Sequence, residues 1–362
     1  MNNINAIKFL SEGTSILSLV KTGEPSNISL EYSYNGVDWD RWDFSSLTVN
    51  SGDTLYIRGN NPNGFSSRLE AYYSFVIEGD RVSCSGNIMS LIDYKNLPDI
   101  IPNDYCFYKL FSKCTALTTT PELPATKLAY RCYCRMFFAC SSLTTVPELP
   151  APRLKDSCYY QMFSGCSSLT TAPELPAIEL AESCYESMFS GCSSLTTAPE
   201  LPATRLKDSC YYQMFSGCTA LVKAPELPAP RLANFCYSNM FFACSSLTTA
   251  PELPATRLAD NCYDNMFYGC TALTTAPELP ATKLADYCYA YMFKGCTSLA
   301  KSPVLPAKSL AKSCYAGMFY GCTSLTAKPE LLATMFARWC YDYMFAGCTA
   351  LKDEQFLSNN IQ

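Results

Sequence analysis

Hydrophobic and polar positions follow a fixed order in a segment that recurs along the chain, as in CYDNMFYGC at residues 262–270. The Cys, Tyr, Met, Phe and Cys of this segment hold from copy to copy, whereas the residues between them change almost every time. At about 100° per residue, the kept and the changing positions fall on separate halves of a helical wheel. The pattern therefore predicts a helix of roughly ten residues in each copy, with one face packed on a core and the other in solvent.

The segment repeats with a strict period of 26 residues. Its first Cys recurs in ten copies, from Cys106 to Cys340, and a second Cys follows eight residues later, from Cys114 to Cys348. A constant period of this length is typical of a solenoid, in which each unit buries its apolar face against its neighbours.

The rest of a typical copy reads SLTTAPELPA, as at residues 168–177. Leu-Thr-Thr predicts one short strand per copy, paired in parallel with its neighbours, and the two prolines favour an extended stretch outside that sheet. Because strands stack at about 4.8 Å and helices at about 8–10 Å, we expect a curved stack with the strands inside.

Residues 1–93 alternate apolar and polar side chains in the manner of strands. ISLEYSYNGVDWDRWDF holds Asn35-Gly36, a hairpin signal, and LTVNSGDTLYIRG and AYYSFVIEGD continue the alternation between turn residues. We expect a small antiparallel β-sandwich that covers the N-terminal end of the repeats. The predicted fold is an α/β repeat solenoid of ten 26-residue units preceded by this all-β domain. The domains are a β-sandwich at 1–93, the solenoid at 94–351 and a C-terminal tail at 352–362.

The strings MFSGCSSLT and FSGCTAL resemble the leucine-rich repeats of BspA-like bacterial surface proteins, whose units carry an aromatic residue, a Cys and a Leu in this order. The resemblance covers about residues 97–351. The chain departs from the commoner pattern in its longer repeat, 26 residues rather than about 23, and in its PELP segment. Members of that family are typically adhesion or host-interaction proteins, and the resemblance implies such a role here.

Composition narrows the functional classes. The chain is 48% hydrophobic with no apolar run long enough to span a membrane. Histidine is absent, which removes His general bases, Ser-His-Asp triads and nearly every catalytic zinc site, so we expect no enzyme. Residues 1–93 carry 11 acids and 6 bases, and residues 94–362 carry 21 of each, which favours neither nucleic acid nor an anionic membrane. The first residues, MNNINAIKFLSEG, predict no secretory signal.

Twenty of the 22 cysteines belong to the two repeat columns. A spacing of eight without CxxC pairs does not suit zinc or iron–sulfur ligation, and parallel columns favour buried free thiols over disulfides. We therefore predict no metal and no cofactor. Cys84 and Cys134 lie outside the columns, and Cys134 is expected to be an exposed thiol.

The changing positions form the variable face, defined as the residues two, three and six places after the first Cys. Tyr mixed with Ser, Asn and Asp is similar to the composition of antigen-binding loops. The alternative is drift on a solvated surface. The candidate binding residues are Tyr160, Gln161, Glu186, Tyr212, Gln213, Asn239, Asp264, Tyr268, Tyr291, Tyr320 and Tyr343.

Three further surfaces compete with the variable face. Thr pairs and a Glu column lie on the predicted concave side, where a regular array either meets a repetitive ligand or stays hydrated. Trp39 and Trp42, among Asp residues, are a candidate sugar site, although strand alternation puts at least one of them in the core. In the last copy, apolar residues either cover the core end or form a docking surface. The Thr and Glu residues are Thr170, Thr171, Thr196, Thr197, Glu148, Glu174, Glu200, Glu226, Glu252 and Glu278, and the last-copy residues are Leu332, Met335, Phe336 and Trp339.

Taken together, these features predict a non-enzymatic binding or adhesion protein that recognises a protein or glycan on a cell surface through an extended repeat surface. The alternative is a structural or receptor-binding component of a bacteriophage virion, such as a tail or head projection. Residues 1–93 loosely resemble segments that precede such repeats in gut Bacteroidales and their phages. The expected location is extracellular, at the cell surface or in a virion, with no membrane insertion; self-assembly into a homo-oligomer or a virion stays open.

Overall fold

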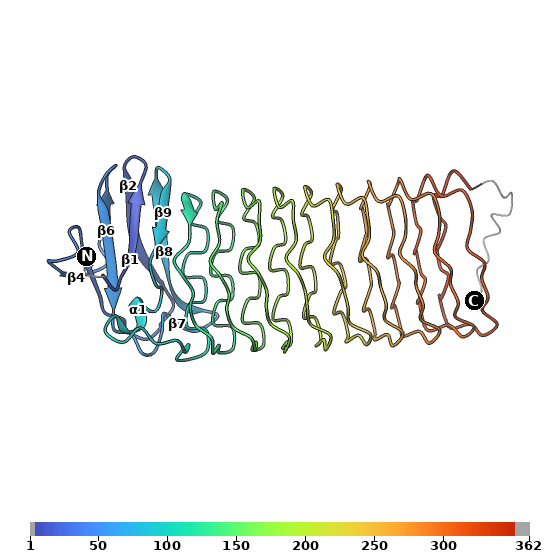
Figure 1. Cartoon of the computed structure of the whole chain (residues 1–362), viewed down its shortest axis with the longest axis horizontal. Helices are drawn as coiled ribbons and strands as arrows, with labels where there is room; N and C mark the ends of the chain where they lie inside the picture. The colour runs from blue at the N-terminus through green and yellow to red at the C-terminus, as the bar shows by residue number, and fades with distance from the viewer. Residues whose placement is uncertain (1–3, 352–362) are drawn as a thin grey trace. The chain divides into compact units, whose positions relative to one another are not determined.

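The computed structural model describes residues 4–351, so the predicted tail at 352–362 lies outside the described residues. The chain forms two compact units, Met1–Ala177 and Ile178–Gln362. The first unit holds the N-terminal sheets and three repeat copies, and the second unit holds the later copies (Figure 1). The first copies thus belong to the same compact unit as the N-terminal sheets.

Two sheets open the first unit. Their strands are β1 Ile7–Ser11, β2 Ser15–Thr22, β3 Leu30–Ser33, β4 Asp40–Trp42, β5 Leu47–Val49, β6 Thr54–Gly59, β7 Ser66–Arg68, β8 Ala71–Gly79, β9 Val82–Ser85 and β10 Leu117–Thr119. One sheet has the order β10-β9-β1-β6-β3-β4 and the other β5-β2-β8-β7. Every pair among β1 to β9 is antiparallel, as predicted.

Aromatic side chains join the two sheets. The rings of Phe9 in β1 and Phe75 in β8 lie 5.7 Å apart, and the indole of Trp42 in β4 stacks on Phe75 at 6.3 Å. Burial alternates along β1 and β8, which places one face of each sheet in this core. The expected hairpin joins β3 to β4, with Asn35 Oδ1 accepting hydrogen bonds from the backbone N–H groups of the next turn residues.

The first repeat copy continues the N-terminal sheets through backbone hydrogen bonds. Strand β10 pairs in parallel with β9, and the N–H of Val82 donates to the carbonyl of Ala116 at 2.9 Å. The N–H groups of Phe65 and Phe75 donate to carbonyls of the same copy. These bonds satisfy carbonyls that no earlier copy could reach, in line with the expectation that the N-terminal domain covers this end of the repeats.

The helix predicted in each copy is wrong. In the copy that begins at Cys262, the N–H of Asp264 donates to the carbonyl of Asn261, three residues back, at 3.2 Å. The next N–H, that of Asn265, donates instead to Ala290 in the following copy at 2.9 Å. Asn261 and Asn265 have positive φ angles of 56° and 52°. The segment is therefore a series of tight turns in which alternate amides bond to the next copy, and not a helix with bonds to the fourth residue back.

The predicted division between buried and outward positions is nevertheless correct. Cys262, Tyr263, Met266 and Phe267 are fully buried, whereas the residues between them are partly exposed. Buried pairs recur every four residues, which matches the four-residue turns. Over nine residues, a period of four differs too little from 3.6 for the pattern alone to separate the two structures. The one α-helix among the described residues is α1, Ser90–Asp93.

Aromatic columns run through the core of each unit. In the second unit, Phe267 stacks between Phe241 and Phe293 with ring centroids 5.6 and 5.7 Å away. In the first unit, Phe137 stacks on Phe111 at 5.4 Å. Because no repeat copy forms a helix within residues 94–351, the wide helix spacing on which the expected curvature rested is absent there.

A regular strand in every copy is also wrong for the described residues. The first copy forms β10, but later copies contribute isolated parallel bridges, such as Thr249 with Thr275. A second row of bridges joins Arg231, Arg257 and Lys283. The prolines between these rows remove backbone donors, which limits each row to single bridges.

Candidate functional site

The variable face lies on the outer side of the turn segments. The residue three places after each first Cys has a positive φ, including 51° at Gln161 and 53° at Tyr291. Most of these positions are partly exposed, whereas Ser187 is buried and Tyr343 is 65% exposed. In the first unit, Arg135 Nε donates to Gln161 Oε1 at 2.7 Å, which joins two outward side chains of neighbouring copies.

In the second unit, three predicted tyrosines surround one lysine. The Nζ atom of Lys294 lies 5.0 Å from the ring centroid of Tyr268, 5.2 Å from that of Tyr291 and 5.0 Å from that of Tyr320. These distances suit cation–π attraction, which holds the rings around the ammonium group. We name Tyr268, Tyr291, Lys294 and Tyr320 the aromatic cluster. Phe242 extends it, stacking on Tyr268 with 4.7 Å between centroids.

The ring of Tyr291 lies over the backbone of Gly317 in the next copy. A Cβ atom at Gly317 would collide with that ring, so only glycine allows the ring to rest there. Burial and the negative charges of Asp342 and Asp264 raise the pKa of Tyr291. Burial also raises the pKa of Asp264 to about 6. Carboxylates therefore lie beside the aromatic cluster.

The structure thus gathers some of the predicted binding residues and not others. Asp264, Tyr268, Tyr291 and Tyr320 belong to one patch, and Tyr343 follows in the column of Tyr291 with 65% of its side chain exposed. The other predicted residues of the second unit occupy earlier copies of the same face, and two lie in the first unit. Those residues are Glu186, Tyr212, Gln213 and Asn239 in the second unit, and Tyr160 and Gln161 in the first.

Lys294 and Asp342 lie on the variable face as defined from the sequence, but they were not among the candidate binding residues. Lys294 occupies the column of Tyr268 and Tyr320, so its position six residues after the first Cys was a usable signal. Asp342 occupies the column of Asp264. Both belong to the changing positions, but the sequence did not show which of these would meet.

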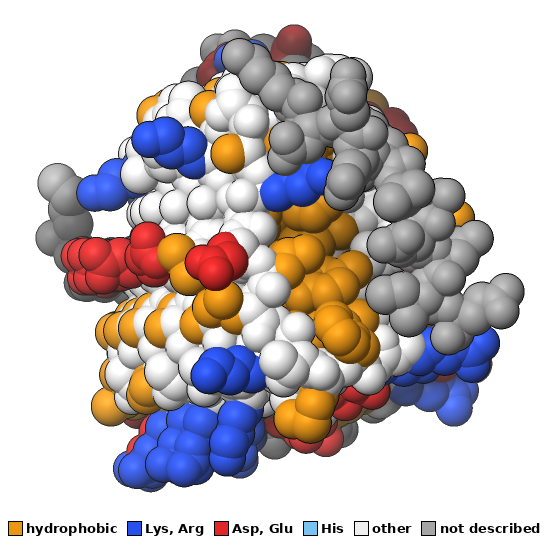
Figure 2. Space-filling model, turned by 90° about the vertical axis from the view of Figure 1, so that its right-hand side faces the viewer, with side chains coloured by type: hydrophobic (Ala, Val, Ile, Leu, Met, Phe, Trp, Pro, Cys, Tyr) orange, Lys and Arg blue, Asp and Glu red, His pale blue; other side chains and the backbone are white. Residues whose placement is uncertain are grey.

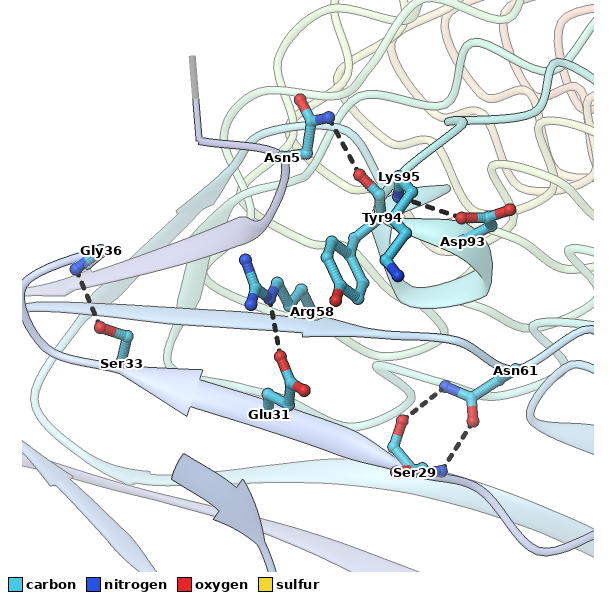
Figure 3. A network of polar contacts seen from close by, with 10 residues as sticks. All are labelled: Asn5, Ser29, Glu31, Ser33, Gly36, Arg58, Asn61, Asp93, Tyr94 and Lys95. Atoms are coloured by element: carbon cyan, nitrogen blue, oxygen red, sulfur yellow. Dashed lines mark hydrogen bonds and ion pairs between the residues drawn. The ribbon is translucent and has the colours of Figure 1, made fainter. Parts of the chain in front are cut away.

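The two tryptophans of the candidate sugar site do not form a common surface. Trp42 is 2% exposed, and its Nε1–H donates to the carbonyl of Ser45 at 2.7 Å, which makes it the core tryptophan expected from strand alternation. The guanidinium of Arg58 covers the ring of Trp39 at 3.7 Å. Arg58 also lies 4.1 Å from the ring of Tyr94 and pairs with Glu31 at 2.8 Å (Figure 3). The Trp39 ring is therefore engaged within the domain.

All 22 cysteines are buried and none forms a disulfide, as predicted for the columns. The second Cys of a copy donates its thiol to a phenylalanine carbonyl of the preceding copy, for example Cys270 to Phe241 at 3.1 Å. Burial raises the pKa of Cys244 to about 12, so the thiol stays protonated and unreactive. The expectation of an exposed Cys134 is wrong, because this side chain is 2% exposed. Among residues 4–351, no group of three His, Cys, Asp or Glu side chains could hold a metal ion.

The Thr and Glu columns border two adjoining grooves in the second unit, with volumes of about 630 and 510 Å³. The larger is lined by Thr197, Glu200 and Pro202 of one copy and by Lys223 and Glu226 of the next. Alanine, proline and leucine contribute to the apolar part of both linings, and Val222 adds to that of the larger groove. The grooves combine an apolar lining with carboxylates, a second arrangement suited to contact with a partner.

The apolar residues of the last copy remain exposed. Met335 is 61% and Phe336 55% exposed, and the guanidinium of Arg338 lies 3.9 Å above the ring of Trp339. Figure 2 shows hydrophobic side chains gathered at this end of the second unit. Within the described residues, nothing buries them.

Short stacked copies with Leu, Phe and Cys columns define a protein of the leucine-rich repeat class. The family model for the BspA type leucine-rich repeat region, which contains six copies, matches residues 103–248, 208–326 and 260–362. Together these matches cover most of the chain, and the chain belongs to this family. A search among curated proteins found no match.

Membership in this family indicates a general role. Leucine-rich repeats are typically non-enzymatic binding modules, and BspA-type repeats suggest protein binding or adhesion. Proteins with these repeats are typically located at the surface or secreted. None of the helices in the described part of the chain is long and apolar enough to span a membrane.

Proposed function

We propose that this protein is a non-enzymatic adhesion protein that recognises a protein or glycan on a cell surface through the variable face of its second unit. The aromatic cluster is the observation that carries the proposal. It presents the faces and edges of three tyrosines together with an ammonium group and neighbouring carboxylates.

The physical properties of the cluster suit recognition. Tyrosine rings offer large contact areas at a small cost in conformational entropy, and their hydroxyls add hydrogen bonds. Contacts between Lys294 and the three rings hold the side chains in place before any partner arrives, which reduces the entropy lost on binding. Tyr320 is 41% exposed, so part of this surface is open to a partner.

Binding of the purified full chain to whole bacterial cells and to glycan and protein arrays tests the proposal. One variant carries Tyr268→Ala, Tyr291→Ala and Tyr320→Ala. A control variant carries three substitutions on another exposed column of the same unit, namely Thr197→Ala, Thr249→Ala and Thr275→Ala.

We expect the tyrosine variant to bind at least about tenfold more weakly, because a single aromatic anchor often contributes more than about 1.4 kcal/mol. The threonine variant should bind as the unmodified chain does, and all three proteins should share one circular dichroism spectrum. Equal binding by both variants would place recognition elsewhere. Absence of binding by the unmodified chain would favour the alternative, a rigid structural component of a virion, for which neighbouring capsid and tail genes are a direct check.

A further inference from the structure

Two columns of like charge run along the second unit. The acidic ladder consists of glutamates two residues before a proline in successive copies, and the basic ladder consists of Arg or Lys five residues further on. All eight side chains are exposed, and none takes part in an ion pair within the described residues. The acidic ladder is Glu200, Glu226, Glu252 and Glu278, and the basic ladder is Arg205, Arg231, Arg257 and Lys283.

Backbone bridges hold the charges of the basic ladder close together. Arg231 pairs with Arg257, and Arg257 pairs with Lys283, as directly opposed parallel residues. Parallel strands lie about 4.8 Å apart, which is well within the screening length of about 8 Å at physiological salt. Like charges at this separation repel one another, and no acid in the described part of the chain forms an ion pair with them.

The two ladders cannot neutralise each other within one copy. Between Glu200 and Arg205 lie Leu-Pro-Ala-Thr, and the proline favours an extended backbone. Five extended residues span about 16–18 Å. Figure 2 shows acidic and basic side chains in separate rows. Each ladder therefore offers its charge outward.

The grooves beside the acidic ladder add an apolar component. Glu200 and Glu226 border the larger groove, together with Ala198, Pro225 and Pro228. Arginine carries a long aliphatic stem below its charged group, and such stems pack on apolar surface while the guanidinium meets a carboxylate. Lys223 lines both grooves as well, but two glutamates border each of them, so a basic ladder can fill the grooves and pair with the carboxylates at their rims in the same contact.

We propose that the second unit associates side by side with a second copy of this chain, the acidic ladder and groove of one copy receiving the basic ladder of the other. A second copy is favoured because its ladder has the opposite charge and the same 26-residue period, so all charges pair in register. Residues 94–362 contain 21 acids and 21 bases, so the repeat regions do not repel each other through net charge. A single exposed ion pair contributes little free energy to association, but several ion pairs formed in one contact strengthen the association together.

Sedimentation velocity of the full chain tests this proposal without any cell or glycan, so its failure is distinct from failure of the proposed adhesion. The expected result is self-association at about 0.02 M salt that is lost toward about 0.5 M, because added salt shortens the screening length of the charges. A monomer at every salt and protein concentration would overturn the proposal. The same holds for self-association that salt does not weaken.

Two charge-reversal variants provide the decisive test of the proposal. One variant reverses the acidic ladder, with Glu200→Lys, Glu226→Lys, Glu252→Lys and Glu278→Lys. The other reverses the basic ladder, with Arg205→Glu, Arg231→Glu, Arg257→Glu and Lys283→Glu. Each variant alone should be monomeric, because both of its ladders then have one sign, whereas an equal mixture should associate. A control variant adds lysines at exposed positions away from both ladders, with Thr219→Lys, Thr271→Lys, Thr297→Lys and Thr323→Lys.

The control variant should still self-associate, which separates ladder pairing from a general effect of added charge. Circular dichroism identifies any reversed variant that fails to fold. In that event, variants with only the two central substitutions, such as Glu226→Lys with Glu252→Lys, replace it. Folded reversed variants that do not associate on mixing, or that associate alone, would overturn the proposal.

Discussion

Replacement of Gly295 by alanine tests the left-handed backbone of the turn segment, because a helix that continued through this residue would predict the opposite change in stability. Gly295 has a φ of +73°, in the left-handed region. A residue with a Cβ is disfavoured there by about 1–2 kcal/mol. An added Cβ would lie 3.7 Å from atoms of Gly269, an ordinary contact, so steric crowding adds little to this cost.

The expected magnitude follows from two opposing effects. Gly295→Ala costs about 1–2 kcal/mol in the folded chain and recovers about 0.4–1 kcal/mol, because alanine restricts the unfolded chain. The net expectation is a loss of stability on the order of 1 kcal/mol. In the interior of a helix, the same substitution would stabilise by about 0.5–1 kcal/mol.

Hydrogen exchange read by mass spectrometry over residues 288–300 measures the local opening free energy, and urea denaturation followed by circular dichroism measures the unit as a whole. Gly295→Ala should exchange faster than the unmodified chain. The reciprocal control is Ala243→Gly at the equivalent position of another copy, where φ is +57°. This change should leave stability unchanged or raise it slightly. If Gly295→Ala proves stabilising and Ala243→Gly destabilising, the left-handed backbone conformation at these two positions is wrong.

Three further outcomes are expected. A membrane-permeant thiol reagent should label none of the 22 cysteines in the native chain, Cys134 included, and all of them after unfolding, because every thiol is buried; rapid native labelling of Cys134 would contradict its burial. Phe267→Ala should destabilise the second unit by about 3–5 kcal/mol in urea denaturation, since the ring stacks between two others, while Thr297→Ala on the exposed face should cost little. Burial raises the pKa of Asp264 to about 6 from an ordinary value of 3.8, so the folded chain holds this proton more tightly than the unfolded chain. Stability should therefore fall as pH rises from about 4 to about 6, by on the order of 2–3 kcal/mol, and Asp264→Asn should flatten that profile; a profile that is unchanged in the variant would refute the assignment.

Much of the repeat region was predictable, because a 26-residue period exposes the same position ten times. The Cys, Tyr, Met and Phe kept in the turn segments are the buried residues there, and the two thiol columns are buried without disulfides, as expected. The local backbone was not predicted correctly. Asn261, Asn265 and Gly269 recur at every fourth place and tolerate positive φ, which is a signal that favours turns. Tyr291 and Trp339 adopt positive φ without any such signal, since neither residue type favours it.

The candidate site was predictable as a set of residues and not as a cluster. The changing positions identified the tyrosines of the variable face. Their grouping depends on contacts between copies, as when Lys294 lies between Tyr268 and Tyr320, each 26 residues away. These contacts depend on how far each copy is displaced from the next. A helix in each copy would have placed these side chains at different distances from one another.

The sequence by itself determined the repeat, its period, the buried columns and the absence of histidine chemistry, because these properties belong to residue types and their spacing. The tertiary structure decided between helix and turn. A helix satisfies its amides within its own segment, whereas here alternate amides, such as that of Asn265, donate to a carbonyl 25 residues ahead. The carbonyl that accepts this bond is far from Asn265 in the sequence, and Tyr268 and Tyr320 are about as far from Lys294. Packing of one copy on the next therefore set both the backbone conformation and the surface that the protein presents.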